Sequence, residues 1–157
     1  MAEQATAVPR TADATALGVQ HVAVVVDTID VAHLIARVSH AGVGAISTFL
    51  GTVREHNDGR AVTGIDYEAY EPMASLELMA IAQETCVATP GLQVAIEHRI
   101  GTLVVGDVSV AIAASHARRA PAMAATQRVI ETLKQRVPIW KREHYVDGER
   151  AWVDPTK

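Results

Sequence analysis

The chain has 157 residues, of which 49% are hydrophobic and 20% are charged, and its formal net charge is −4. This length suits one domain with a sizeable core, and the composition excludes a largely disordered protein. No window approaches 18 uninterrupted apolar residues, so we expect no membrane span. The N-terminal residues lack the basic start and apolar run of a secretory signal, so we expect a cytoplasmic protein.

The charge is unevenly distributed along the chain. Residues 116–143 contain seven of the fourteen Lys and Arg residues but only two acids, so the remainder is strongly acidic. The overall negative charge argues against general binding of nucleic acid. The basic segment has two interpretations that the composition leaves open: a solvated helix face, or a pocket for an anion.

The first part of the chain carries signals for a strand and a helix. Residues 1–17, rich in Ala and Thr, predict a mobile tail before a single domain over residues 18–157. A β-branched run predicts a strand over residues 19–26. Asp30 belongs to a capping sequence for the short helix that follows, which we expect to end near Gly42.

Two further strands flank a strong turn signal. Residues 45–54 and 62–70 carry the β-branched and alternating apolar residues of strands. Between them, the Asn-Asp-Gly sequence at 57–59 favours a tight turn. We therefore expect these two strands to pair with each other as a hairpin.

A long helix is expected next. It opens at Pro72 and stops at Pro90, because proline suits a first helical turn and interrupts a helix elsewhere. Leu76 and Leu78 are both expected on its apolar side.

The remaining main elements are two strands and a helix, over residues 92–100, 108–114 and 120–136. Pro138 ends this last helix, and small strand segments follow it. The order β-α-β-β-α-β-β-α is typical of an α+β protein with a mixed, largely antiparallel sheet and three main helices.

The end of the last helix carries a group of residues that suits proton transfer. Lys134 lies on its final turns, and Lys141 follows beyond Pro138, so helical periodicity does not relate the two. If the chain turns back at Pro138, both amines reach one cleft, where mutual repulsion and burial lower their pKa values. Glu143 would balance one of the charges. The alternative is a pair of cations that only interacts favourably with the helix dipole.

Two further groups of cations are candidates for binding an anion. Arg54 lies at the end of a strand, where its guanidinium binds either a phosphate or a neighbouring acid. His116, Arg118 and Arg119 lie where a strand gives way to the last helix. Two arginines at a helix N-terminus are unfavourable unless an anion compensates their charge.

Other chemistries find little support in the sequence. The histidines lack metal-binding spacing, and no phosphate-binding loop or dinucleotide motif occurs. Cys86 is the only cysteine, which excludes an intrachain disulfide, and no basic residue adjoins it to activate the thiol. We therefore expect an inert thiol and no metal site formed by a local motif; a metal site assembled from distant parts of the fold stays open.

Four ordered blocks of the chain match one known family. They are Gly44–Gly59 with Phe49-Leu-Gly-Thr-Val-Arg54, Tyr67–Ala74, His98–Asp107, and Leu133–Glu143 with Pro138-Ile-Trp-Lys141-Arg-Glu143. On these blocks the chain resembles the large, catalytic subunit of molybdopterin synthase from about Val19 to Val153.

The resemblance implies an α/β hammerhead fold and a homodimer at the centre of a heterotetramer. A small ubiquitin-like sulfur-carrier subunit would insert its C-terminal Gly-Gly thiocarboxylate into the pocket of this chain. The reaction would convert cyclic pyranopterin monophosphate (precursor Z) into molybdopterin by installing the two sulfurs of a dithiolene. The subunit itself would need no metal or cofactor.

The resemblance also assigns roles to individual residues. Lys134 matches the key catalytic lysine of the family, and Lys141 matches its second active-site lysine. Phe49 and Arg54 match pocket residues that bind substrate, and Glu143 matches an acid near the second lysine.

One position departs from the family pattern. The family carries a His-Arg pair 16 and 15 residues before the catalytic lysine, where this chain has Arg118 and Arg119. Arg119 keeps the arginine, whereas the histidine is replaced and His116 stands two residues earlier. All three remain candidates for substrate binding.

Two other functions stay open at this point. A non-catalytic dimeric module that binds a phosphorylated metabolite would need the anion pocket but no sulfur-carrying partner. An RNA-binding domain is disfavoured by the net charge and by an aromatic share of 4%, which leaves few rings for base stacking.

Overall fold

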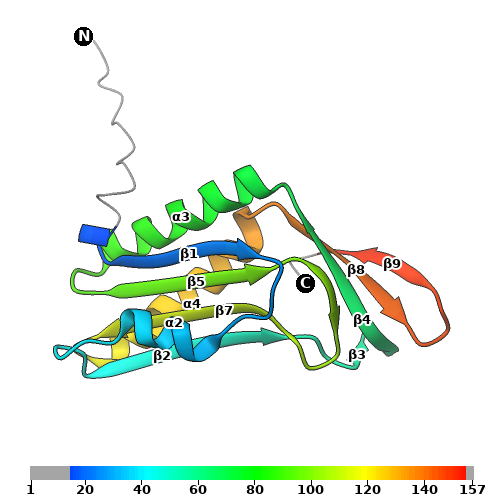
Figure 1. Cartoon of the computed structure of the whole chain (residues 1–157), viewed down its shortest axis with the longest axis horizontal. Helices are drawn as coiled ribbons and strands as arrows, with labels where there is room; N and C mark the ends of the chain where they lie inside the picture. Colours follow the sequence, from blue (N-terminus) through cyan, green and yellow to red (C-terminus); the bar gives the residue numbers. More distant parts are fainter. Residues whose placement is uncertain (1–14, 155–157) are drawn as a thin grey trace, which may run out of the picture.

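The computed structural model describes residues 15–154 (Figure 1). The tail expected over residues 1–17 therefore lies almost entirely outside the described residues. Its last three residues belong to a turn in which the Gly18 N–H donates to the carbonyl of Thr15 over 3.0 Å. Within the described part of the chain, no helix is long and apolar enough to cross a membrane.

Two β-sheets and three main helices form the fold. One sheet has four strands in the order β1 (Val19–Val25), β5 (Gln93–Arg99), β7 (Val108–His116) and β2 (Ala45–Thr52). β1 pairs with β5 in parallel, and the other two pairings are antiparallel. The second sheet is antiparallel and contains β3 (His56–Asn57), β4 (Arg60–Ala69), β8 (Ile139–Tyr145) and β9 (Arg150–Val153), with β6 (Gly101–Val104) also on β4. The predicted α+β class with mixed, largely antiparallel sheets is confirmed.

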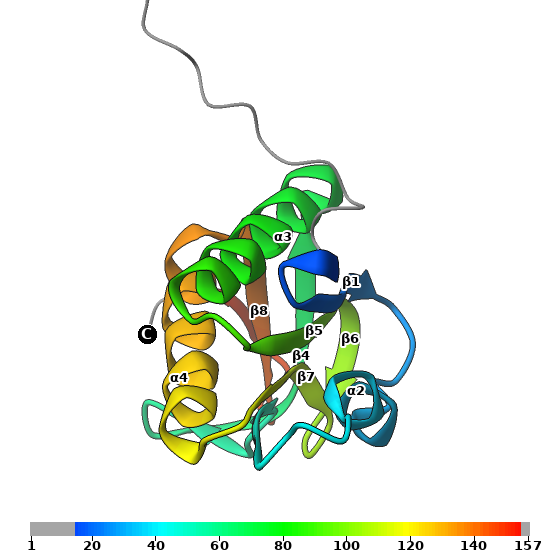
Figure 2. The ribbon, with the colours of Figure 1, turned by 90° about the vertical axis from the view of Figure 1, so that its left-hand side faces the viewer.

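The helices cover both faces of the four-stranded sheet. α3 (Glu71–Ala88) and α4 (Arg119–Arg136) lie on one face, and α2 (Val31–Val38) lies on the other (Figure 2). Neighbouring strand residues serve opposite faces: Ile96 and Ile112 pack in the core under α3 and α4, whereas Ala95 and Ala113 pack in the core under α2. This alternation follows from the two-residue period of a strand and explains why β5 and β7 are apolar on both sides.

Local signals define where the helices begin and end. The Asp30 carboxylate accepts a hydrogen bond from the His33 N–H at 3.0 Å and caps α2. Pro72 occupies the first turn of α3, where its missing N–H costs nothing. α4 ends at Arg136, just before Pro138.

The predicted hairpin between residues 45–54 and 62–70 is wrong. β2 pairs with β7, and β4 pairs with β8 and β6, so the two strands belong to different sheets. The chain leaves the first sheet at Val53. The Val53 N–H donates to the Asp107 carbonyl, and the Val53 carbonyl accepts from the Gly106 N–H. The Asn-Asp-Gly turn instead closes a small hairpin between the two residues of β3 and the start of β4.

The expected apolar side of α3 is only partly correct. Leu78 is fully buried in the main core, but the side chain of Leu76 is 72% exposed. The buried Ala74 and Leu78 are four positions apart and share one side of the helix, and Leu76, halfway between them, lies on the opposite side.

We expect Leu78→Ala to lower the free energy of unfolding by about 2–5 kcal/mol, because it removes a fully buried side chain and leaves a cavity. The matched control Leu76→Ala, in the same helix, changes it by less than about 0.5 kcal/mol. Urea unfolding followed by circular dichroism measures both. Equal losses in the two variants would contradict the observed orientation of α3.

Candidate functional site

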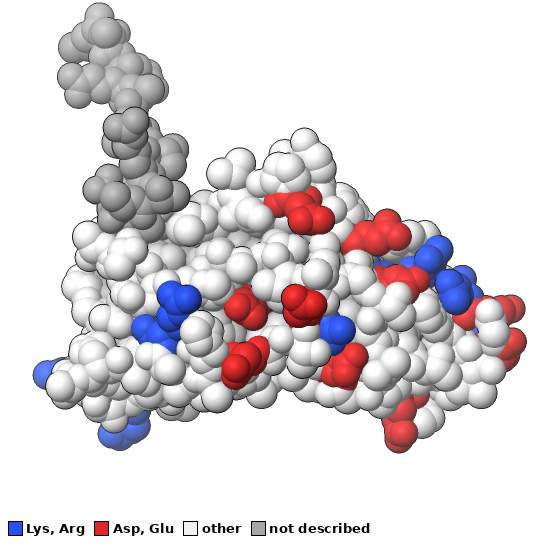
Figure 3. All heavy atoms as spheres, in the orientation of Figure 1, with Lys and Arg blue, Asp and Glu red and all other residues white. Residues whose placement is uncertain are grey.

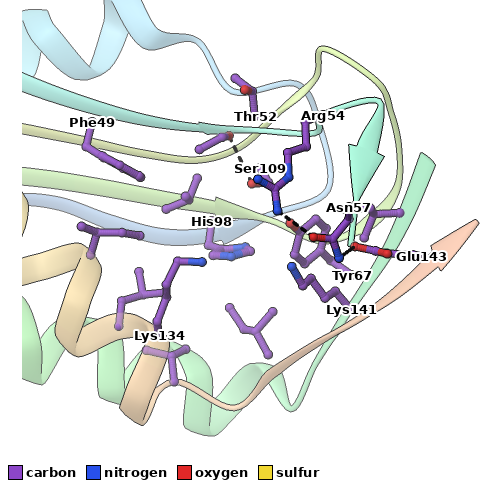
Figure 4. A pocket seen from close by; sticks show the side chains of 17 residues that line it. Phe49, Thr52, Arg54, Asn57, Tyr67, His98, Ser109, Lys134, Lys141 and Glu143 are labelled. Carbon is purple, nitrogen blue, oxygen red and sulfur yellow. Dashed lines mark hydrogen bonds between the residues drawn. The ribbon is translucent and has the colours of Figure 1, made fainter. Parts of the chain in front are cut away.

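A cavity of about 380 Å³ lies where the two sheets meet the end of α4. Side chains from β2, β4, β7, α4 and β8 form its wall (Figure 4). Its lining residues are Phe49, Gly51, Thr52, Arg54, Asn57, Ile65, Tyr67, His98, Ser109, Val110, Ile130, Leu133, Lys134, Val137, Ile139, Lys141 and Glu143.

The turn after α4 brings the two lysines to the same cavity. Lys134 lies on the last turns of α4, and beyond Pro138 the chain reverses into β8, which carries Lys141. Alternate residues of β8 and β4 face the cavity, because Lys141 pairs with Tyr67 and Glu143 pairs with Ile65. The nitrogen ends of Lys134, Lys141 and Arg54 all point into the same space (Figure 4).

The environment of Lys141 lowers the pKa of its amine. Burial lowers its pKa below the ordinary value of 10.5, and the positive charges of Lys134 and Arg54 lower it further. The negative charge of Glu143 acts in the opposite direction. On the face of the molecule in Figure 3, by comparison, acidic and basic side chains are interspersed.

A chain of hydrogen bonds runs along one wall of the cavity. Arg54 Nη2 donates to Asn57 Oδ1 at 2.6 Å, and Asn57 Nδ2 donates to Glu143 Oε1 at 2.8 Å. The Tyr145 hydroxyl donates to Glu143 Oε2 at 3.0 Å. Glu143, at 2% exposure, therefore has a hydrogen bond to each carboxylate oxygen, as a buried acid requires.

His98 is a buried, neutral histidine in the cavity wall. Its Nδ1 lies 2.9 Å from the carbonyl of Arg99, so this nitrogen carries the proton and Nε2 is the acceptor. Burial lowers its pKa to about 4, and the charge of Lys134 acts in the same direction. Its ring lies edge-on to Tyr67, with 5.4 Å between centroids.

Sequence reasoning did not assign roles to several residues of the cavity. The sequence places Asn57 in a turn and in a matching block, and Tyr67 and His98 in matching blocks, without giving any of the three a role in the site. Gly51 is required by close packing, since a Cβ there would lie 2.7 Å from Val110 Cγ1. In each case the distinguishing signal is a contact between distant segments, which has no local pattern.

The basic group at the start of α4 lies outside this cavity. Arg119 precedes Lys134 by fifteen residues on one helix, a separation of about 22 Å at 1.5 Å per residue. His116 instead contacts the backbone before α4 and the loop between α3 and β5. Its Nδ1 accepts from the Arg118 N–H at 3.0 Å, and its Nε2 lies 3.2 Å from the Pro90 carbonyl. Within one chain, His116, Arg118 and Arg119 therefore cannot share a ligand with Lys134.

Neither the cysteine nor a metal cluster contributes to this site. Cys86 is buried in the main core, and burial raises its pKa to about 11, which suppresses the reactive thiolate. Residues 15–154 contain no group of three or more His, Cys, Asp or Glu side chains arranged to hold a metal ion.

The profile of the MoaE protein family matches residues 24–136. The chain belongs to this family. It is 45% identical over 131 residues to the molybdopterin synthase catalytic subunit of Halalkalibacterium halodurans, covering 83% of each chain. The crystal structure of molybdopterin synthase from Staphylococcus aureus matches with a TM-score of 0.80 and 36% identity, over 83% of this chain and 95% of that chain.

A more distant match shares the fold. The complex of subunits 1 and 2 of molybdopterin-converting factor from Helicobacter pylori contains a chain with a TM-score of 0.70 and 19% identity. The match covers 84% of this chain and 89% of that chain. This match shows that the two chains share a fold.

We expect the pKa of Lys141 to rise in Lys134→Met, because this substitution removes one of the charges that lower it. Glu143→Gln should lower it further, since it removes the opposing negative charge. The chain has three lysines, so reductive ¹³C-dimethylation gives a simple NMR titration in which variants assign the signals. An unchanged Lys141 titration in both variants would show that the charges do not interact.

Proposed function

We propose that this chain is the catalytic subunit of molybdopterin synthase. It transfers sulfur from the C-terminal thiocarboxylate of a small carrier subunit to cyclic pyranopterin monophosphate, and forms the dithiolene of molybdopterin. The observation that carries the proposal is the joint presence of Lys134, Lys141 and Arg54 around one cavity in a member of the MoaE family. No metal or organic cofactor takes part in this role.

The charge of the cavity suits the two reactants. Both the cyclic phosphate of the substrate and the thiocarboxylate of the carrier are anions, and three cations point into the cavity. Arg54 is exposed and offers a planar fork of donors to a phosphate. Phe49 provides an apolar wall beside these charges, as a pterin ring needs.

The nucleophile comes from outside this chain. Its single cysteine is buried in the core with a raised pKa, so the sulfur of the carrier performs the attack. Lys134 orients the thiocarboxylate and stabilises the charge that develops during attack. Lys141, whose pKa is lowered, moves protons as the cyclic phosphate opens.

The proposed sulfur transfer also requires an assembly with the carrier subunit. The carrier binds with its tail in the cavity, two copies of this chain form the central homodimer, and the complete heterotetramer acts in the cytoplasm. The complex of subunits 1 and 2 from Helicobacter pylori supports a small-subunit partner.

The homodimer also gives the basic group at the start of α4 a place in catalysis. Arg119 is too far along α4 to reach the cavity of its own chain. In the homodimer, Arg119 with its neighbours His116 and Arg118 binds substrate in the cavity of the second copy.

Lys134→Ala should lower dithiolene formation by at least about 100-fold, because it removes the amine that orients the reacting sulfur. The assay uses purified precursor and thiocarboxylated carrier, and measures molybdopterin by fluorescence after oxidation. The matched control Arg128→Ala removes an exposed cation of the same helix outside the cavity and keeps activity. Carrier binding and oligomeric state should be unchanged in both; wild-type turnover in Lys134→Ala would reject the assignment.

Co-expressed Lys134→Ala and Arg119→Ala chains should recover activity that neither variant has alone. Half of the dimers are then mixed, and each mixed dimer has one intact site, so about a quarter of the wild-type sites are restored. Distinct affinity tags allow the mixed dimer to be isolated. An inactive mixed dimer would place Arg119 outside the catalytic site.

A further inference from the structure

Asn57 lies between Glu143, the buried acid of the described cavity wall, and Arg54, the arginine that lines the same cavity. Its amide accepts from Arg54 at 2.6 Å on one side and donates to Glu143 at 2.8 Å on the other. We propose that Asn57 is a positioning residue: a neutral spacer that holds the Arg54 guanidinium at the cavity and prevents Glu143 from neutralising it. This inference rests on the proposed function, since it assigns Arg54 to the substrate phosphate.

An amide is suited to this position because it is a donor and an acceptor at once. A carboxylate there would accept from Arg54 but would repel Glu143, and an apolar side chain would bind neither. A direct pair between Arg54 and Glu143 would cancel the charge that attracts an anion. The amide connects the two charged groups through hydrogen bonds and leaves both charges in place.

The bonding of both neighbours fits this role. Glu143 receives one neutral donor on each oxygen, from Asn57 and from Tyr145, and so is satisfied without a bound cation. Among the described residues, the bond to Asn57 is the one hydrogen bond of the Arg54 side chain. The other N–H groups of this exposed guanidinium therefore remain available to an anion in the cavity.

The backbone fixes the amide in place. Asn57 pairs with Arg60 in the small β3–β4 hairpin, and the turn between them has positive φ at Asp58 (48°) and Gly59 (76°). Such a turn holds two strands in a single register. Glu143 is positioned independently by the pairing of β8 with β4. The β3–β4 hairpin thus holds Asn57, and β8 holds its acceptor Glu143. Because both backbones are fixed, the Asn57 side chain has little freedom to move.

The decisive variant is Asn57→Asp, which changes charge with little change in shape. The new carboxylate pairs with Arg54, so the variant should bind sulfate, a tetrahedral dianion that does not titrate here, at least about fivefold more weakly at pH 8.5. In this variant the carboxylate at position 57 contacts that of Glu143, and the two share a proton as the pH falls. The protonated side chain at position 57 is then neutral and can donate and accept hydrogen bonds, as the amide of Asn57 does. The loss should therefore shrink below pH 6. Isothermal titration calorimetry measures sulfate binding at both pH values.

Two control variants separate this effect from general charge or folding defects. His56→Asp adds the same charge at the exposed neighbouring position and should leave sulfate binding within about twofold of wild type. Asn57→Ala removes both hydrogen bonds without adding charge, and its weaker binding should show no recovery at low pH. Thermal unfolding followed by circular dichroism verifies that each variant is folded.

Turnover gives a second readout. Asn57→Asp should raise KM for the precursor about tenfold at pH 8.5 with a smaller change in kcat, since a phosphate contact acts before and during reaction. Unchanged sulfate binding and KM in folded Asn57→Asp would overturn the inference, as would a loss independent of pH. A wild-type protein that binds sulfate but forms no dithiolene would instead reject the proposed function.

Discussion

The site depends on holding like charges close together at the reversal of the chain after α4. Amines at residues 134 and 141 repel each other, and burial of the second adds a desolvation cost. The repulsion is offset by the core on which both elements rest: Leu133, Val137 and Ile139 are all buried around the turn. Hydrophobic packing thus forces two cations into one cavity, and an anionic ligand relieves the repulsion when it binds.

The second sheet also helps to hold the like charges together, because its strand β8 carries Lys141. β8 carries Lys141 and Glu143 on the cavity side and Arg142 on the other, where it donates to Asp66 at 2.8 Å and lies over the ring of Trp152. The carboxylate of Asp66 also accepts from Thr102, and these bonds hold its pKa well below the usual range. A well-paired outer face keeps the strand in register, so the inner face can carry charges that are poorly paired.

Much of the fold could be predicted from the sequence because its signals are local. Capping at Asp30, proline at 72 and 138, and the periodicity of the strands predicted all the main elements within a few residues. The pairing of β2 and β4 was predicted wrongly, since an Asn-Asp-Gly turn indicates a reversal of the chain but not how long the paired strands are. Only the contacts of Val53 with residues 106 and 107 reveal that the chain changes sheets there.

For the site, too, residues with a local signal could be predicted, and those that depend on distant contacts could not. Lys134, Lys141 and Glu143 could be selected from the sequence because they flank the helix-breaking Pro138, and Arg54 because it ends a predicted strand; the family resemblance then assigned their roles. Asn57 could not, because its importance arises from Glu143, which is 86 positions away in the chain and is placed beside it by β4. An asparagine in a turn satisfies the local requirement completely, and membership of a matching block does not tell which side chain it contacts. Asn57 both forms a turn and contacts a distant acid. The turn alone explains an asparagine at this position, so the distant contact is recognised only in the folded cavity.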